Sequence, residues 1–275
     1  MREDNWFLRL WKIIYPMLIF FVVSQVVATV ACILIGVNVV LKSQGASSDI
    51  MIDVMNVVNR NLVLITFITH LASMPILYWF YIKDKKKIVV SSQVDAITVC
   101  LVVILGICTC IGINTLISAS PLPKLFPNDV QETAQSLYSE GILVQILAIV
   151  IGAPIVEELI FRGLIFKRMR TYSNFYIAAI VTSICFGVFH GRIVQGLYGF
   201  LLGFLLAFIF EKTKSLKMCI LFHLLANATS VALTNVKLLA SIYEKFAILI
   251  CGLCIVIGCV VGVCLYRHKI PYREE

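Results

Sequence analysis

Two carboxylates and a guanidinium lie within six residues of each other in the apolar segment 153–163. Glu158 and Arg162 are four residues apart, so on a helix they face each other and can form a charge-assisted pair. Glu157 is rotated by about 100° from Glu158 and lacks that partner. An unpaired carboxylate in apolar surroundings is a candidate general base, metal ligand or proton carrier.

Two histidines and an asparagine follow in later apolar segments. His190 ends the string Phe186-x-x-x-His190, and His223 and Asn227 are four residues apart, which places them on one helical face. A carboxylate and an imidazole can deprotonate water, while an amide or imidazole N–H can stabilise an oxyanion. These residue types therefore fit hydrolysis by an activated water, without a serine or cysteine nucleophile.

The same residues also have structural interpretations. His190 alone is explained equally well as an interfacial histidine whose hydrogen bonds water satisfies. A purely structural network of all these polar residues would be expensive to build in lipid, however, and this favours a functional site. The other two histidines receive structural roles: we expect His70 to pack or bond locally and His268 to belong to the basic C-terminal flank.

Zinc is the candidate cofactor. Glu157, His190 and His223 could supply the three protein ligands of a catalytic zinc site that keeps an open position for water. The sequence lacks the His-Glu-x-x-His string that identifies many zinc proteases, so metal dependence stays open at this point.

The elements that must position these residues are membrane helices. Hydrophobic residues make up 60% of the 275 residues and charged residues 14%, with a mean hydropathy of +0.98, which leaves too little polar surface for a soluble fold. The apolar runs exceed the roughly 10 residues of a barrel strand, so an outer-membrane barrel is excluded. We predict an all-α, polytopic transmembrane helix bundle with about eight spans. The spans are 13–41, 62–82, 96–117, 142–166, 175–189 (short for a full crossing), 193–210, 216–236 and 242–266.

The basic residues predict the orientation of this bundle. With a cytoplasmic N-terminus, 16 of the 23 basic residues fall on the cytoplasmic side and six on the other. This bias predicts a multi-pass protein of the plasma membrane, preferably a bacterial inner membrane, with both termini cytoplasmic. Topology explains the net charge of +8, so no nucleic-acid partner is expected. The ten cysteines all lie in apolar runs and are expected to be small apolar filler.

Three short motifs carry a resemblance to a known family. They are Glu-Glu-x-x-x-Arg at 157–162, Phe-x-x-x-His at 186–190 and His-x-x-x-Asn at 223–227. In this order they resemble the motifs of the CAAX prenyl protease and bacteriocin-processing (CPBP, or Abi) family of intramembrane proteases, over about residues 140–235. The resemblance implies an eight-helix endopeptidase with its site in a water-filled cavity, acting on a peptide or protein substrate within or at the lipid bilayer.

The resemblance also implies a role for each motif residue. Glu157 would activate the hydrolytic water together with His190. His223 and Asn227 would stabilise the transition state or bind a metal. The remaining charged pair of the first motif would hold the helix of Glu157 in register.

The same resemblance suggests a division of the chain. Residues 1–120 show no match beyond apolar helices, so we expect three N-terminal spans with an outward loop there. Residues 121–275 are expected to form the catalytic CPBP-like core of five spans.

Helix lengths place a strict condition on a shared site. At 1.5 Å per residue, Glu158 lies about 13 Å from Lys167, whereas His190 lies about 24 Å from Asn174 at the start of its helix. Straight parallel helices would put the two residues at different depths, so a shared site requires tilt or displacement. We expect the site to open mainly toward the cytoplasm.

Two other classes of function remain open. Intramembrane Glu, Arg and His also suit the proton relay of a transporter or ion channel. A non-catalytic immunity protein of the same fold, which binds a peptide without cleaving it, is the second. Replacing Glu157 separates them, because a protease loses cleavage with its fold intact while a pure binder keeps its protective effect.

Overall fold

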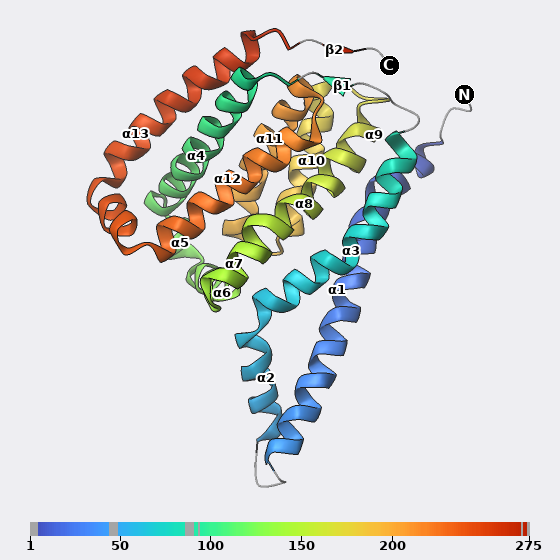
Figure 1. Cartoon of the computed structure of the whole chain (residues 1–275), viewed down its shortest axis with the longest axis vertical. Coiled ribbons are helices and arrows are strands. Elements are labelled where there is room, and N and C mark those ends of the chain that lie inside the picture. Colours follow the sequence, from blue (N-terminus) through green and yellow to red (C-terminus); the bar gives the residue numbers. More distant parts are fainter. Residues whose placement is uncertain (1–4, 44–48, 86–90, 93, 271, 274–275) are drawn as a thin grey trace.

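The structure is a computed structural model that describes residues 5–43, 49–85, 91–92, 94–270 and 272–273. Within these residues the chain is almost entirely helical (Figure 1), which confirms the predicted all-α class. The helices are α1 (Trp6–Ser43), α2 (Ile50–Arg60), α3 (Leu62–Lys85), α4 (Ala96–Ala119), α5 (Leu122–Leu125), α6 (Pro127–Tyr138), α7 (Ile142–Gln145), η1 (Ile146–Gly152), α8 (Ala153–Glu158), η2 (Leu159–Phe166), α9 (Lys167–Met169), α10 (Phe175–Phe189), α11 (Ile193–Thr213), α12 (Leu216–Asn235) and α13 (Lys237–Arg267). Two-residue strands β1 (Ser91–Ser92) and β2 (Tyr272–Arg273) pair in antiparallel register.

Each predicted span coincides with a helical segment. In the described residues seven segments are long and apolar enough to cross a membrane, with α7 to α9 joined into one of them, Ile142–Met169. The eighth, α10, has 15 residues and is the span whose length was expected to be short. The chain is therefore a polytopic, multi-pass membrane protein.

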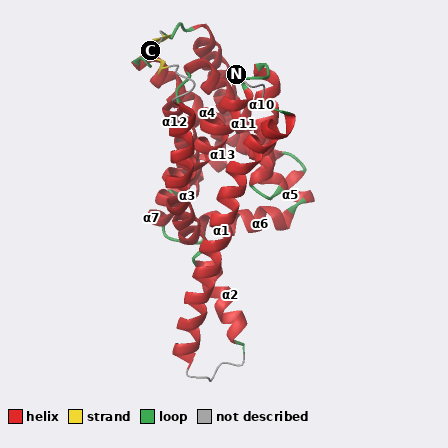
Figure 2. Ribbon diagram, turned by 90° about the vertical axis from the view of Figure 1, so that its right-hand side faces the viewer, coloured by secondary structure: helices red, strands yellow, loops and turns green. Residues whose placement is uncertain are grey.

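The two ends of the bundle differ. Both described ends of the chain lie at one end of the bundle, and α6 lies at the other (Figure 1). The distal part of α1 and the adjoining α2 project beyond the bundle at the α6 end, as the second view also shows (Figure 2). Termini on the same side agree with an even number of crossings.

Helix α6 is held against the start of α11 by polar contacts. The backbone N–H of Val194 donates to Asp129 at 2.7 Å, and Glu132 lies 3.7 Å from the guanidinium of Arg192. A carboxylate at a helix N-terminus satisfies an otherwise unpaired N–H and complements the helix dipole. These contacts anchor α6 at this end of the bundle.

The segment that carries the first motif is unusual because two stretches of π-helix, η1 and η2, flank the short α-helix α8. A π-helical stretch widens the turn and shifts the carbonyl groups out of the regular hydrogen-bond ladder, and such stretches are frequent at functional sites. All eight residues of η2 are buried, so this segment forms the centre of the bundle.

Helices α10 and α11 approach each other closely through glycines. A Cβ on Gly187 would lie 2.6 Å from the carbonyl oxygen of Gly196, and one on Gly203 would lie 3.2 Å from Phe186 and Ser183. Small residues at such an interface let two helix backbones come together in a membrane. The close approach brings the end of α10 against the start of α11.

The N-terminal helices are tied to the core through Arg168 of α9. Its Nε donates to Asp84 of α3 at 2.6 Å, and its Nη1 donates to the carbonyl oxygen of Lys12 in α1 at 2.7 Å. Its Nη2 also donates to the hydroxyl of Tyr15, whose ring lies 4.8 Å below the guanidinium. One arginine therefore links three segments at the end of the bundle that carries the termini.

Candidate active site

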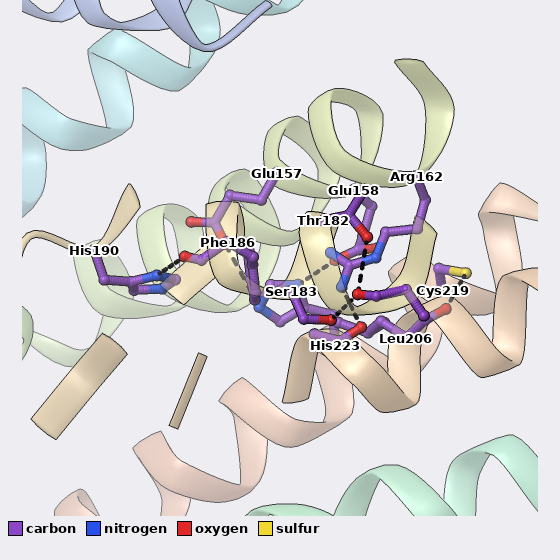
Figure 3. Close-up of polar contacts among 12 residues, drawn as sticks. Glu157, Glu158, Arg162, Thr182, Ser183, Phe186, His190, Leu206, Cys219 and His223 are labelled. Carbon is purple, nitrogen blue, oxygen red and sulfur yellow. Dashed lines mark hydrogen bonds and ion pairs between the residues drawn. The ribbon is translucent and has the colours of Figure 1, made fainter. Parts of the chain in front are cut away.

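Glu158 is the centre of a buried polar cluster (Figure 3). Its Oε1 accepts a hydrogen bond from Nη1 of Arg162 at 3.0 Å, the i,i+4 pair that the spacing suggests. The same oxygen lies 2.9 Å from Nδ1 of His223 on α12. All three residues are at most 3% exposed. A carboxylate beside Nδ1 requires a hydrogen on that nitrogen, so Glu158 fixes the tautomer and the orientation of the His223 ring.

Arg162 is held by two other groups as well as by Glu158. Its Nη2 donates to the carbonyl oxygen of Gly203 on α11 at 2.8 Å, and its Cζ lies 4.8 Å from the centre of the Phe186 ring. Phe186 in turn meets the rings of both His190 and His223 edge-on, at centroid distances of 5.0 and 5.8 Å. One aromatic ring therefore packs against members of all three motifs.

Glu157 lies at the edge of this cluster. Its side chain is 11% exposed, its Oε2 lies 3.8 Å from Nε2 of His223, and it lines a cavity. The neighbouring glutamates therefore have different surroundings: Glu158 is fully buried against Arg162 and His223, whereas Glu157 faces open space. The helical rotation between adjacent residues produces this difference.

His190 lies at the end of α10 and faces the same cavity as Glu157. Its Nδ1 lies 2.7 Å from the carbonyl oxygen of Phe186. A carbonyl oxygen only accepts hydrogen bonds, so Nδ1 carries the hydrogen and Nε2 keeps its lone pair. Gly199 makes room for the ring, because a Cβ there would lie 3.1 Å from Nδ1 of His190.

Glu157 and His190 reach the same cavity because of the directions in which their side chains point. α10 follows the segment 142–169 after a short turn and runs antiparallel to it. Side chains tilt toward the N-terminus of their own helix, so Glu157 and His190 lean toward each other from opposite directions. Both border one cavity, which meets the condition set by the helix lengths.

Asn227 lies one helical turn after His223 and borders the cavity too. Its Nδ2 donates to the carbonyl oxygen of Ile149 in η1 at 2.8 Å. An amide nitrogen has two hydrogens, so one remains for another acceptor. The bond connects α12 to the π-helical stretch that precedes Glu157.

The cavity has a volume of about 360 Å³ and is lined by six of the longer helical segments, among them α1 and α3. It lies in the half of the bundle toward α6, since its lining includes Ser136 and Leu137 of α6 and Arg192 at the start of α11. Both termini lie at the opposite end (Figure 1). The expectation of a site that opens on the side of the termini is therefore wrong, because α10 begins at that end and carries His190 to the other.

The three candidate zinc ligands are not gathered around one point in this structure. Among the described residues, no group of three His, Cys, Asp or Glu side chains is placed to hold a metal ion. Nδ1 of His223 bonds Glu158 and Nδ1 of His190 bonds a backbone carbonyl, which leaves Nε2 of each ring toward the cavity, but the three side chains do not converge on one point. The proposed set of Glu157, His190 and His223 thus borders one cavity without the mutual geometry of a zinc site.

Sequence reasoning missed two residues that the structure places at the site. Phe186 was quoted only as a motif position, although it is fully buried against both histidines. His70 of α3 was expected to pack or bond locally, yet it lines the cavity. An ionisable residue inside an apolar span was the signal that could have identified it.

Comparisons with known proteins match the segment that carries these motifs. Residues 139–229 match the family model described as "Type II CAAX prenyl endopeptidase Rce1-like". The chain is also 35% identical over 85 residues to a Bacillus subtilis (strain 168) protein named "Putative membrane peptidase YdiL". That alignment covers 31% of this chain and 34% of the relative, so the chain spans about a third of the length of the curated relative it matches. No solved structure matches the chain. All three motifs lie inside the range that matches this family model.

Proposed function

We propose that this protein is an intramembrane endopeptidase that hydrolyses a peptide bond with an activated water. One observation carries the proposal: Glu157, His190, His223 and Asn227 come from three separate helical segments and border a single cavity inside an apolar bundle. Polar groups that converge in such a cavity are costly to maintain, which favours a catalytic use over a structural one. The substrate is a peptide or protein within or at the membrane.

Glu157 is the proposed general base. As the water oxygen bonds to the carbonyl carbon, Glu157 accepts the released proton, and it returns this proton to the amine nitrogen as the C–N bond breaks. His190 offers the lone pair of Nε2 to the other hydrogen of the same water and so orients it. The fixed Nδ1 bond to Phe186 keeps that lone pair available.

His223 and Asn227 are the proposed oxyanion groups. The second amide hydrogen of Asn227 can donate to the tetrahedral intermediate. His223 donates through Nε2 when it is protonated, while its Nδ1–H stays on Glu158. Each such donor typically contributes about 10²- to 10³-fold to the rate. No step requires a metal, in keeping with the geometry of the cavity.

Orientation and domain roles are also proposals. The excess of basic residues on the side of the termini supports cytoplasmic termini in a bacterial inner membrane. With that orientation the cavity lies in the non-cytoplasmic half of the bilayer, so we propose that substrate enters from that side. Residues 121–275 would form the catalytic core, and residues 1–120 would supply three spans, of which α1 and α3 close one wall of the cavity.

The proposal is tested by comparing membranes from cells that express the wild type, Glu157→Gln or Glu244→Gln. Glu244 is an exposed residue of α13, so its variant controls for loss of a glutamate charge. Chemical labelling of new protein N-termini, followed by mass spectrometry, would identify the products. We expect a set of N-termini that both the wild type and Glu244→Gln produce and Glu157→Gln does not.

The two other functional classes give different results in the same comparison. A pure peptide binder would protect cells equally well with Glu157→Gln, and its N-termini would not change. A proton-coupled transporter would lose uptake of its solute in Glu157→Gln, again with unchanged N-termini. Either result contradicts a peptidase.

A further inference from the structure

His70 is a buried histidine whose Nδ1 has no hydrogen-bond partner in the described part of the chain. The residue is 4% exposed, and it lies in α3, outside the segment that matches the family model. An unsatisfied polar atom in an apolar interior is energetically unfavourable, so its presence here requires an explanation.

The surroundings of His70 orient its ring. Phe20 of α1 packs over it at a centroid distance of 5.8 Å and an interplanar angle of 31°. On another side Nδ1 lies against Gly152 of η1, where a Cβ would be only 3.1 Å away. The ring is thus held between α1 and the π-helical stretch, and it borders the cavity that Glu157 also borders.

These contacts determine which nitrogen of the His70 ring carries the hydrogen and can donate it. A buried N–H without an acceptor is rarer and more costly than an unused lone pair. The favoured neutral tautomer of His70 therefore leaves Nδ1 unprotonated against Gly152 and carries its hydrogen on Nε2. The ring then offers one N–H donor on the edge that Gly152 does not cover.

Helix α3 adds hydrogen-bond acceptors on the same face. Thr66 and Thr69 line the cavity beside His70. Their hydroxyls donate to the carbonyl oxygens of Leu62 and Ile65, at 2.8 and 3.1 Å, which leaves oxygen lone pairs free to accept. A polar strip of one donor and two acceptors therefore borders the same cavity as Glu157.

We propose that His70 is a substrate-positioning residue: its Nε2–H binds a main-chain carbonyl of the substrate, and the Thr66 hydroxyl accepts a main-chain N–H. The proposal rests on the peptidase function proposed above. Four residues of α3 advance about 6 Å, which is close to the roughly 6.6 Å between alternate residues of an extended peptide. The strip is therefore spaced for an extended backbone.

Binding through main-chain groups also specifies the conformation of the substrate. A transmembrane helix satisfies its backbone N–H and C=O groups internally and has none to offer to α3. The segment bound between α3 and α8 must therefore be non-helical at the bond that is cut. The N-terminal helices thus take part in substrate binding rather than only anchoring the core.

The test uses the purified full-length protein in lipid vesicles and a library of internally quenched, random-sequence decapeptides. Initial rates at increasing library concentration give an apparent KM and kcat. His70→Phe keeps a ring but loses the N–H donor. We expect this variant to raise KM about five- to tenfold, because the loss of one hydrogen bond weakens substrate binding by about that factor. The kcat should stay within about twofold of the wild-type value. His70→Gln, which carries an N–H near the same position, should regain most of the loss.

A second variant protects the test against misfolding. Thr66→Val removes an exposed hydroxyl. It should raise KM about two- to fivefold, because an exposed, neutral hydrogen bond contributes less to binding affinity than a buried one. Thr29→Val of α1 is its matched control, because the Thr29 hydroxyl makes the same type of local bond, to Gln25, and does not line the cavity. It should leave KM unchanged.

The possible failures can be distinguished. If the wild type cleaves the library and neither His70→Phe nor Thr66→Val changes KM, the positioning role is overturned while the peptidase remains. Equal loss in His70→Gln and His70→Phe, with lowered thermal stability in both, would show a packing role and overturn it as well. If the wild type leaves the library intact and matches Glu157→Gln, the proposed function fails and the inference fails with it.

Discussion

Nδ1 of His223 lies 2.9 Å from Oε1 of Glu158, so the histidine of the third motif is oriented by the second glutamate of the first. The same oxygen also accepts a bond from Arg162. The two adjacent glutamates thus have different roles in the structure: Glu158 holds Arg162 and His223 in place, whereas Glu157 borders the cavity and lies 3.8 Å from Nε2 of His223. This division supports the roles that we propose for them.

Neutralising Glu158 should destabilise the fold as well as reduce cleavage. Glu158→Gln leaves the Arg162 guanidinium buried without a counter-charge, and breaking a buried pair in this way costs about 3–5 kcal/mol. Chemical unfolding in detergent would measure the loss. In a double variant, Glu158→Gln with Arg162→Met, the loss should be smaller than the sum of the two single losses, because the uncompensated charge is removed. Additive losses would contradict the pairing.

A methyl group at Gly199 should displace His190, the residue proposed to orient the water, without unfolding the protein. In Gly199→Ala the new Cβ would lie 3.1–3.2 Å from two atoms of the His190 ring, so the ring must move. We expect cleavage to fall at least about tenfold, since small displacements of catalytic groups are costly. Gly262→Ala on α13 is the matched control, because a Cβ there meets nothing within 4 Å. Equal activity of the two variants would argue against the placement of His190.

Replacing Arg168 by lysine should loosen the N-terminal helices. Lysine keeps the charge but cannot bond Asp84, the Lys12 carbonyl and Tyr15 at once. We expect backbone amides of α1 near Tyr15 to exchange with deuterium at least about tenfold faster, equivalent to about 1.4 kcal/mol. Amides of α12 should keep their rates, and a uniform change over the whole protein would contradict a local tie.

Removal of metal should leave the activity intact. The cavity offers Glu157 and His223 near each other but no group of three suitable side chains in the described residues. The protein would be treated with a strong chelator such as 1,10-phenanthroline and then desalted. Its cleavage rate should stay within about twofold of the rate of the untreated protein, a smaller change than the loss of one hydrogen bond would cause. Loss of activity that zinc restores, and that magnesium does not, would disprove a metal-free mechanism.

Much of the fold could be predicted from the sequence because hydropathy reports directly on membrane spans. The apolar runs located the seven candidate membrane spans of the described residues and the shorter α10, and the i,i+4 spacing predicted the Glu158–Arg162 pair. Both features depend on local sequence alone. The contact between His223 and Glu158 crosses from one helix to another, and spacing along a single chain carries no information about such a pair.

The position of the cavity was harder to predict, for geometrical reasons. Straight-helix arithmetic separated Glu157 from His190, since it ignored the direction of the side chains and the two π-helical stretches. The count of basic residues predicts on which side of the membrane the termini lie, but it carries no information about the cavity, which lies at the opposite end of the bundle. His70 was overlooked because which face of α3 meets the core depends on tertiary packing.

The central claim is that Glu157 activates water to cut a peptide bond. Its most direct test is cleavage of the decapeptide library by the purified protein in ¹⁸O-labelled water, with mass spectrometry of the products. We predict that wild type and Glu244→Gln each place one ¹⁸O atom in the new carboxyl group, and that Glu157→Gln, folded and equally abundant, forms no product above background. Cleavage by Glu157→Gln at the wild-type rate would contradict the account.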